Sequence, residues 1–151
     1  MKAIIVEDEI RSAKLLENLL RDYCPDVQLI GSASSVDAGF HLVQNNAIDI
    51  VFLDIEMQKE SGFDLLNKFE NINFEIIFTT AFEHYALKAI KFSAIDYLLK
   101  PIDIEELKAA ISKVSKNNQR HLMNKKFEIL MQNRNVDQTG YMQIALPSTE
   151  G

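Results

Sequence analysis

Five short apolar runs alternate with five helical patterns over about the first 115 residues, and this alternation constrains the fold more than any other feature. The runs, which are rich in Ile, Val, Leu and Phe, cover residues 2–6, 27–31, 48–54, 74–78 and 95–99. A nearly unbroken apolar run is typical of a strand that is buried on both faces of a parallel sheet. Parallel neighbours need a crossover helix between them. The sequence therefore predicts an α/β fold, a doubly wound five-stranded parallel sheet with helices on both faces.

Helical spacing and capping residues separate the apolar runs. The predicted helix over residues 9–23 places its apolar side chains at i, i+3, i+4 and i+7, which are Leu16, Leu19, Leu20 and Tyr23. Ser34 or Ser35 can cap a second helix, and Asp103 can cap the last one. A short helix is predicted at 85–92, before the fifth strand. These helices supply the crossovers that a parallel sheet requires.

Length and composition limit the classes of function. At 151 residues the chain has room for one domain of ordinary size and an appendage. No apolar run approaches the roughly 20 residues that span a bilayer, and a single cysteine, Cys24, excludes an intrachain disulfide and fits a reducing cytoplasm. The net charge of −6 argues against nucleic-acid binding by the chain as a whole. Residues 113–134, with six bases and one acid, mark a change of segment.

Polar residues stand at the carboxyl ends of four predicted strands, the edge where open α/β sheets bind ligands. They are Glu7 and Asp8 after the first strand, Asp54 after the third, Thr80 after the fourth and Lys100 after the fifth. Acids that share a crevice repel one another unless a cation lies among them, and carboxylates suit Mg²⁺. Asp54 could then attack a phosphorus atom, with Lys100 and Thr80 binding the phosphoryl oxygens.

Each of these residues also has a structural explanation. Asp54 could be a turn residue, and Glu7 and Asp8 could be charges that favour a helix N-terminus. Thr80 could be an ordinary strand threonine, and Lys100 a solvated surface cation. Such accidents at four of the five strand ends are improbable together, so a magnesium-dependent phosphoryl site is the preferred interpretation.

The segments VEDE, LDIEM, FTTA and DYLLKP carry these residues. In this set the chain resembles a two-component response regulator receiver domain over about residues 1–118. The resemblance implies a flavodoxin/CheY-like sheet with strand order 2-1-3-4-5. It also implies that Asp54 is the phosphoacceptor and that Mg²⁺ is held by Glu7, Asp8, Asp54 and the backbone carbonyl of Glu56.

The same resemblance implies roles for the other strand ends. Thr80 and Tyr97 would be the switch pair, and Lys100 would bind the phosphoryl group, aimed by a cis bond to Pro101. The chain departs from the family pattern at two positions. Glu7 stands where Asp is common, and Gln58 replaces a proline that often follows the methionine, which affects only the rigidity of that loop.

The segment TAFEHYALKAIKFSAIDYLLKPI is similar to receivers joined to a LytTR-type DNA-binding domain, the LytR/AlgR-like regulators. The expected organisation is a receiver at 1–118, a linker at 119–140, and the first strand of a truncated LytTR-type domain at 141–151. The apolar residues of the linker fall at helical spacing, so it is either a helix that continues toward a partner or a solvated, partly disordered segment.

The function implied is a cytoplasmic signalling switch without a membrane contact. A sensor histidine kinase would donate a phosphoryl group to Asp54, and the chain would catalyse only its own phosphorylation and dephosphorylation. A homodimer would form through the fourth helix, fifth strand and fifth helix, with Leu87, Ile90 and Leu98 exposed there, and DNA would be bound only by the output domain. The alternatives are a magnesium-dependent phosphatase or nuclease on the same acids, and a flavin-binding module, which three acids after the first strand disfavour.

Overall fold

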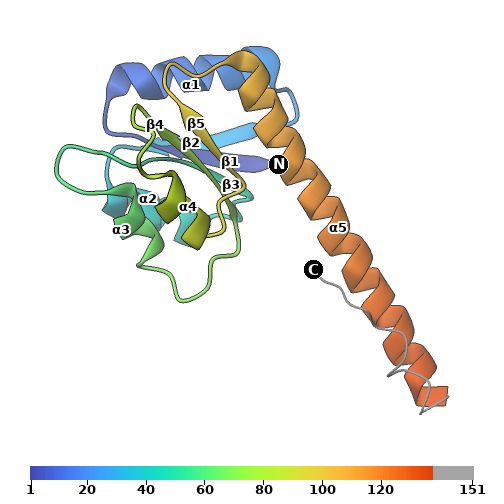
Figure 1. Cartoon of the computed structure of the whole chain (residues 1–151). Coiled ribbons are helices and arrows are strands. Elements are labelled where there is room, and N and C mark those ends of the chain that lie inside the picture. Colours follow the sequence, from blue (N-terminus) through green and yellow to red (C-terminus); the bar gives the residue numbers. More distant parts are fainter. Residues whose placement is uncertain (138–151) are drawn as a thin grey trace. The chain divides into compact units, whose positions relative to one another are not determined.

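A computed structural model of the chain describes residues 1–137 and contains one five-stranded sheet in the order β2-β1-β3-β4-β5 (Figure 1). Every neighbouring pair in this sheet is parallel. The strands are β1 (Lys2–Val6), β2 (Gln28–Ala33), β3 (Ile50–Asp54), β4 (Glu75–Thr80) and β5 (Asp96–Leu99). The predicted doubly wound α/β fold and its strand order are confirmed.

Strand β3 lies at the centre of the sheet, between β1 and β4. All five of its residues are buried, because helices cover both faces of the sheet. Its register with β4 places Asp54 opposite Thr79, and its register with β1 places Leu53 opposite Val6. The carboxyl ends of β1, β3 and β4 therefore meet at one edge.

The helices alternate with the strands as the sequence predicts. They are α1 (Ile10–Tyr23), α2 (Val36–Asn45), α3 (Gly62–Leu66), α4 (Ala86–Lys91) and α5 (Ile104–Asp137). The side chain of Ser35 caps α2 by accepting a hydrogen bond of 3.1 Å from the amide of Ala38, so Ser35 is the cap among the two candidates. Asp103 caps α5 by accepting from the amide of Glu106 at 3.0 Å.

Two apolar cores lie on opposite faces of the sheet. Helices α2, α3 and α4 cover one face, and α1 and the first turns of α5 cover the other (Figure 1). Alternation along β5 sends Tyr97 into the first core and Leu98 into the second. The prediction that Leu98 is exposed is wrong, since α5 covers it and leaves only 2% of it accessible.

Helix α5 belongs to two units of the chain, one comprising Met1–Val114 and the other starting at Ser115. Its first turns pack on the sheet, whereas the second unit exposes large apolar side chains, namely Leu122, Met123, Phe127, Ile129 and Leu130. The predicted linker at 119–140 is helical as far as Asp137, and the strand expected at 141–151 lies outside the described residues. In the part that the structure describes, no helix is long and apolar enough to cross a membrane.

Candidate functional site

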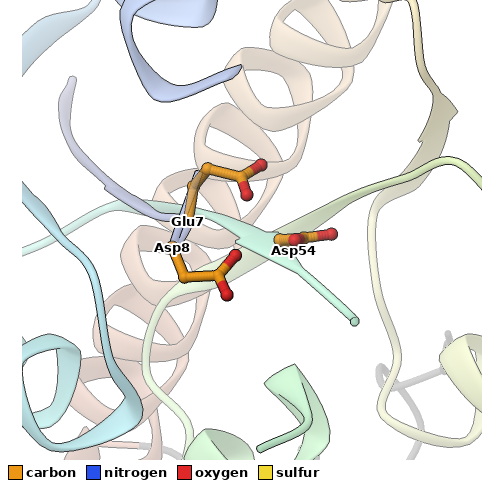
Figure 2. Close-up of side chains that lie close together, drawn as sticks. All are labelled: Glu7, Asp8 and Asp54. Carbon is orange, nitrogen blue, oxygen red and sulfur yellow. The ribbon is translucent and has the colours of Figure 1, made fainter. Parts of the chain in front are cut away.

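Three carboxylates gather at the carboxyl edge of the sheet. Glu7, Asp8 and Asp54 each offer an oxygen, and these oxygens lie within 4.8 Å of one another (Figure 2). Glu7 and Asp54 are only 6% and 4% exposed. Three hard oxygen donors that border an open pocket fit Mg²⁺, which usually takes one or two carboxylates, further oxygens and several waters. The geometry is therefore suited to a divalent cation.

A tight turn places helix α3 directly against this edge. A Cβ atom added to Gly62 would lie 2.1 Å from the backbone oxygen of Asp54, so a residue with a side chain does not fit without movement of the backbone. The amide of Gly62 also donates to the carbonyl of Ile55 at 2.8 Å. The sequence marks this position only as a loop glycine, and the close approach becomes visible in the fold.

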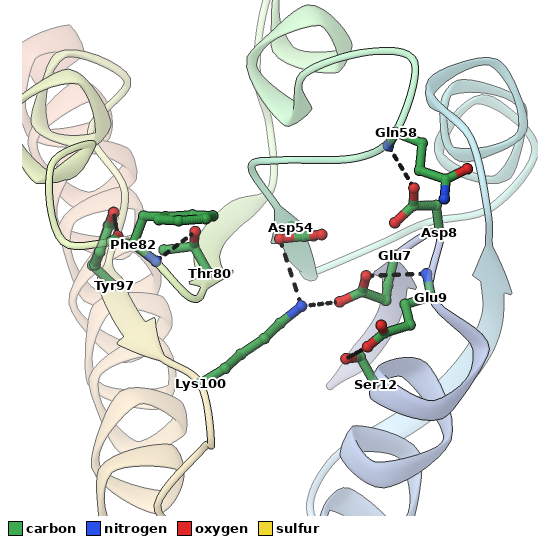
Figure 3. A network of polar contacts seen from close by, with 10 residues as sticks. All are labelled: Glu7, Asp8, Glu9, Ser12, Asp54, Gln58, Thr80, Phe82, Tyr97 and Lys100. Carbon is green, nitrogen blue, oxygen red and sulfur yellow. Dashed lines mark hydrogen bonds and ion pairs between the residues drawn. The ribbon is translucent and has the colours of Figure 1, made fainter.

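Lys100 projects into the acidic cluster from the end of β5 (Figure 3). Its ammonium group forms an ion pair with Glu7 and lies 3.6 Å from the nearer oxygen of Asp54. The Lys100–Pro101 peptide bond is cis, as predicted. The sequence predicts this lysine as a partner of the phosphoryl group, and the structure places it between the two buried acids.

Burial is the main cause of an abnormal pKa at Asp54. Loss of water around its carboxylate, followed by repulsion from Glu7, raises the pKa of Asp54 from 3.8 to about 7, although the Lys100 cation acts in the opposite direction. A cation bound among these carboxylates would favour the charged form and lower the pKa again. The Asp54 carboxylate is thus destabilised in the protein alone and is suited to a site completed by a cation.

The predicted switch residues, Thr80 and Tyr97, both contact Phe82 in the loop after β4 (Figure 3). Thr80 is fully buried, and its hydroxyl oxygen accepts from the amide of Phe82 at 3.2 Å. The Tyr97 phenol donates to the carbonyl of the same residue. Phe82 was missed at the sequence level, because its backbone makes both contacts and a backbone carries no sequence signal.

The loop after Asp54 has two further connections. The amide of Gln58 donates to Asp8 at 2.6 Å, which ties the loop to the end of β1 (Figure 3). The carboxylate of Glu56 accepts a hydrogen bond from the phenol of Tyr85, the residue before α4. The sequence suggested Glu56 only for its backbone carbonyl and gave no signal for Tyr85. The loop and the strand ends border a pocket whose lining includes Glu7, Asp8, Asp54, Glu56, Met57, Gln58 and Lys100.

A pH-dependent stability follows from the raised pKa of Asp54. Between about pH 4 and pH 7 the folded protein binds this proton more tightly than the unfolded chain, so the free energy of unfolding falls as the pH rises through that window. With Mg²⁺ removed by a chelator, Asp54→Asn should therefore be more stable than the parent at pH 8, by about 2 to 4 kcal/mol. Near pH 4 the difference should be small.

Urea unfolding of both proteins at a series of pH values measures this difference. Asp37→Asn, which makes the same change at an exposed carboxylate on α2, is the control and should track the parent. If Asp54→Asn and the parent share one pH dependence, Asp54 has an ordinary pKa in the folded state.

Comparison with known proteins identifies the family of the chain and supports its fold. Residues 3–112 match the family model of the response regulator receiver domain. The Sensory transduction protein LytT of Bacillus anthracis is 33% identical, over 99% of this chain and 60% of that protein. The Sensory transduction protein LytR of Staphylococcus haemolyticus is 36% identical, over 76% of this chain and 45% of that protein. The chain thus spans about half, and at most three fifths, of the length of these relatives.

Solved structures of other proteins have the same fold as this chain. The response regulatory domain of protein mrkE from Klebsiella pneumoniae superposes with a TM-score of 0.70 at 28% identity, over 80% of this chain and 99% of that one. The response regulator TrrA from Thermotoga maritima, solved in complex with Mg²⁺-BeF, gives 0.66 at 25% identity, over 75% and 97%. The alternative of a magnesium-dependent phosphatase finds no support among these proteins. This chain belongs to the response regulator receiver domain family, and its relatives include the LytT and LytR regulators.

Proposed function

We propose that Asp54 accepts a phosphoryl group from a phosphohistidine of a sensor histidine kinase, and that Mg²⁺ is bound by Glu7, Asp8, Asp54 and the backbone carbonyl of Glu56. The observation that carries this proposal is the convergence of three carboxylate oxygens within 4.8 Å, beside an ammonium group, at the carboxyl edge of a receiver fold. A bound divalent cation would offset the charge of the acids and of the incoming phosphate.

The residues divide the chemistry among themselves. A carboxylate oxygen of Asp54 attacks phosphorus as the bond to the donor nitrogen breaks, which produces an acyl phosphate and a free histidine. The Lys100 ammonium, 3.6 Å from Asp54, binds one phosphoryl oxygen. The Thr80 hydroxyl, whose oxygen accepts from the amide of Phe82, donates a hydrogen bond to another phosphoryl oxygen. Water later attacks the phosphorus, which breaks the bond to the Asp54 oxygen, regenerates the carboxylate and releases inorganic phosphate. The chain thus catalyses its own phosphorylation and dephosphorylation and turns over no other substrate.

Incubation with acetyl phosphate and Mg²⁺ tests this function. The expected result is a mass gain of one phosphoryl group per chain, located at Asp54 by peptide mapping and lost when Mg²⁺ is chelated. Steady turnover of phosphate esters without a stable mass gain would instead indicate a phosphatase and would contradict the proposal.

The signal would leave the site through the loop after β4. If Thr80 moves toward a phosphoryl group, its contact with Phe82 changes, and Phe82 also holds the phenol of Tyr97. The expected output is a rearranged face formed by α4, β5 and α5. We further propose that the chain is part of a longer regulator, in which this cytoplasmic receiver at 1–118 would control a LytTR-type DNA-binding domain that begins near residue 141. The length of the LytT and LytR relatives supports this arrangement.

We expect a weak homodimer through this face, tightened by phosphorylation. Leu87 and Ile90 of α4 are 79% and 69% exposed, so two large apolar side chains are available to a second copy. Sedimentation with and without beryllofluoride and Mg²⁺ should show at least about a tenfold tighter dimer with the mimic, and Ile90→Arg should abolish the gain.

Leu15→Arg is the matched control for that experiment. Leu15 is a 52% exposed apolar residue of α1, so the same substitution there should leave association unchanged. Association that is indifferent to the mimic, or that is lost in Leu15→Arg and kept in Ile90→Arg, would reject this dimer face even if Asp54 is phosphorylated.

A further inference from the structure

The phenol of Tyr85 donates a hydrogen bond to the carboxylate of Glu56. These residues are 29 positions apart in the sequence, one immediately before α4 and the other two residues after Asp54. The bond therefore joins the start of α4 to the loop that follows β3, the strand that ends at the proposed phosphoacceptor. Neither the strand-end pattern nor the switch pair of Thr80 and Tyr97 accounts for it.

The backbone at Glu56 is held on one side by a short antiparallel bridge to Ser61. The amide of Met57 donates to Glu60 at 3.2 Å, and the carbonyl of Ile55 accepts from Gly62 at 2.8 Å. In such a bridge the backbone carbonyl of the residue before Glu56 and the backbone amide of the residue after it face the partner strand. The backbone carbonyl of Glu56 itself therefore points away from that strand. That carbonyl is the one proposed to bind Mg²⁺.

The side chain of Glu56 is held by the ring of Tyr85, which other aromatic rings hold in place in turn. The Tyr85 ring is half-buried and lies 4.2 Å from His84, 6.1 Å from Phe63 and 6.5 Å from Phe82, measured between ring centroids. The contact with Phe63 anchors it to α3, at the far end of the same loop. An exposed glutamate side chain normally samples many rotamers, and a hydrogen bond to a fixed phenol removes most of them.

We propose that Tyr85 is a positioning residue for the metal site: by binding the Glu56 carboxylate, it fixes the loop backbone so that the Glu56 carbonyl faces the carboxylates of Glu7, Asp8 and Asp54. Tyr85 itself touches neither the metal nor the phosphoryl group. The proposal rests on the proposed function, since it concerns the magnesium site that phosphorylation of Asp54 requires. Tyr85, the residue before α4, would then be one of the residues that determine the affinity for Mg²⁺.

The test compares Tyr85→Phe with the parent in a calorimetric titration of the full chain with MgCl₂. Loss of the phenol hydroxyl should weaken Mg²⁺ binding by roughly three- to tenfold, at or below the lower end of the range for residues that orient metal ligands. Tyr23→Phe removes a hydroxyl from a 45% exposed ring at the end of α1 and is the matched control. It should bind Mg²⁺ as the parent does.

A second readout needs no metal. In Tyr85→Phe without Mg²⁺, amide hydrogen exchange should be faster at Met57 and Gly62, whose hydrogen bonds form the bridge, and unchanged in the strands of the sheet. A general loss of stability would instead speed exchange in the sheet as well. Glu56→Ala should weaken Mg²⁺ binding by a similar factor, and the double variant Glu56→Ala/Tyr85→Phe should be no weaker than the weaker single variant.

The outcomes separate this proposal from the proposed function. Tyr85→Phe that binds Mg²⁺ as tightly as the parent, or effects of the two substitutions that multiply in the double variant, would overturn the role of Tyr85 and leave phosphorylation of Asp54 intact. A parent chain that binds no Mg²⁺ and gains no phosphoryl group would overturn both.

Discussion

Asp54→Asn is expected to abolish incorporation of phosphate from acetyl phosphate, by more than about a thousandfold in rate. Asp54 ends the central strand with 4% of its surface exposed, and Lys100 is the nearest cation, at 3.6 Å. An asparagine keeps the size of this side chain, but its amide is too weak a nucleophile to form the acyl phosphate. It is also a poorer ligand for a divalent cation. Intact-protein mass spectrometry over time measures the effect.

Unfolding of Asp54→Asn is not expected to explain its loss of labelling. Because the pKa of Asp54 is raised to about 7 when no cation is bound, the asparagine variant should be at least as stable as the parent at neutral pH without Mg²⁺, so it should stay folded in the assay even if it binds no metal. Asp37→Asn is the control and should label as the parent does. Labelling of Asp54→Asn at the rate of the parent would mean that another residue is the phosphoacceptor.

Asp8→Ala should have the second largest effect, through the loss of metal. The carboxylate of Asp8 shares the cluster with Glu7 and Asp54, and it also accepts a hydrogen bond of 2.6 Å from Gln58. Removing one of three carboxylates should weaken Mg²⁺ binding by at least about tenfold and slow labelling by about a hundredfold at low Mg²⁺. Calorimetric titration and labelling at several Mg²⁺ concentrations measure the two quantities.

Glu9→Ala is the matched control, because it removes the next acid along the chain. The Glu9 carboxylate accepts from the hydroxyl of Ser12 and lies outside the cluster of three acids. Glu9→Ala should therefore keep both Mg²⁺ affinity and labelling. Rescue of Asp8→Ala by excess Mg²⁺ would locate its defect in metal affinity, whereas normal labelling at low Mg²⁺ would remove Asp8 from the site.

Local rules were sufficient to predict the elements of the fold and the edge where the site lies. Apolar runs between helical patterns require a parallel sheet, and a parallel sheet brings the carboxyl ends of its strands to one edge. Asp54, Glu7, Asp8 and Lys100 could be assigned to that edge because each directly ends or follows a strand. Their proximity in the structure agrees with this reasoning.

Predictions that depend on packing between distant elements were less secure. Alternation along β5 correctly separates Tyr97 from Leu98, but both faces of this strand are covered, so the residue assigned to the surface is buried. The helical spacing of the linker left two possibilities, and the helix that extends to Asp137 is the one the structure describes. A periodic pattern shows which residues share a face, whereas burial depends on what lies against that face.

The sequence by itself determined the α/β class, the strand-end acids and the receiver family of this protein, because these features depend on residue type and on spacing along the chain. Only the tertiary structure decided that Lys100 pairs with Glu7, that Thr80 and Tyr97 both contact Phe82, and that Tyr85 binds Glu56. Each of these contacts joins loops or side chains whose positions are set by the packing of helices on the sheet. No local rule relates such residues to one another, so the connection between the site and α4 appears only in the folded chain.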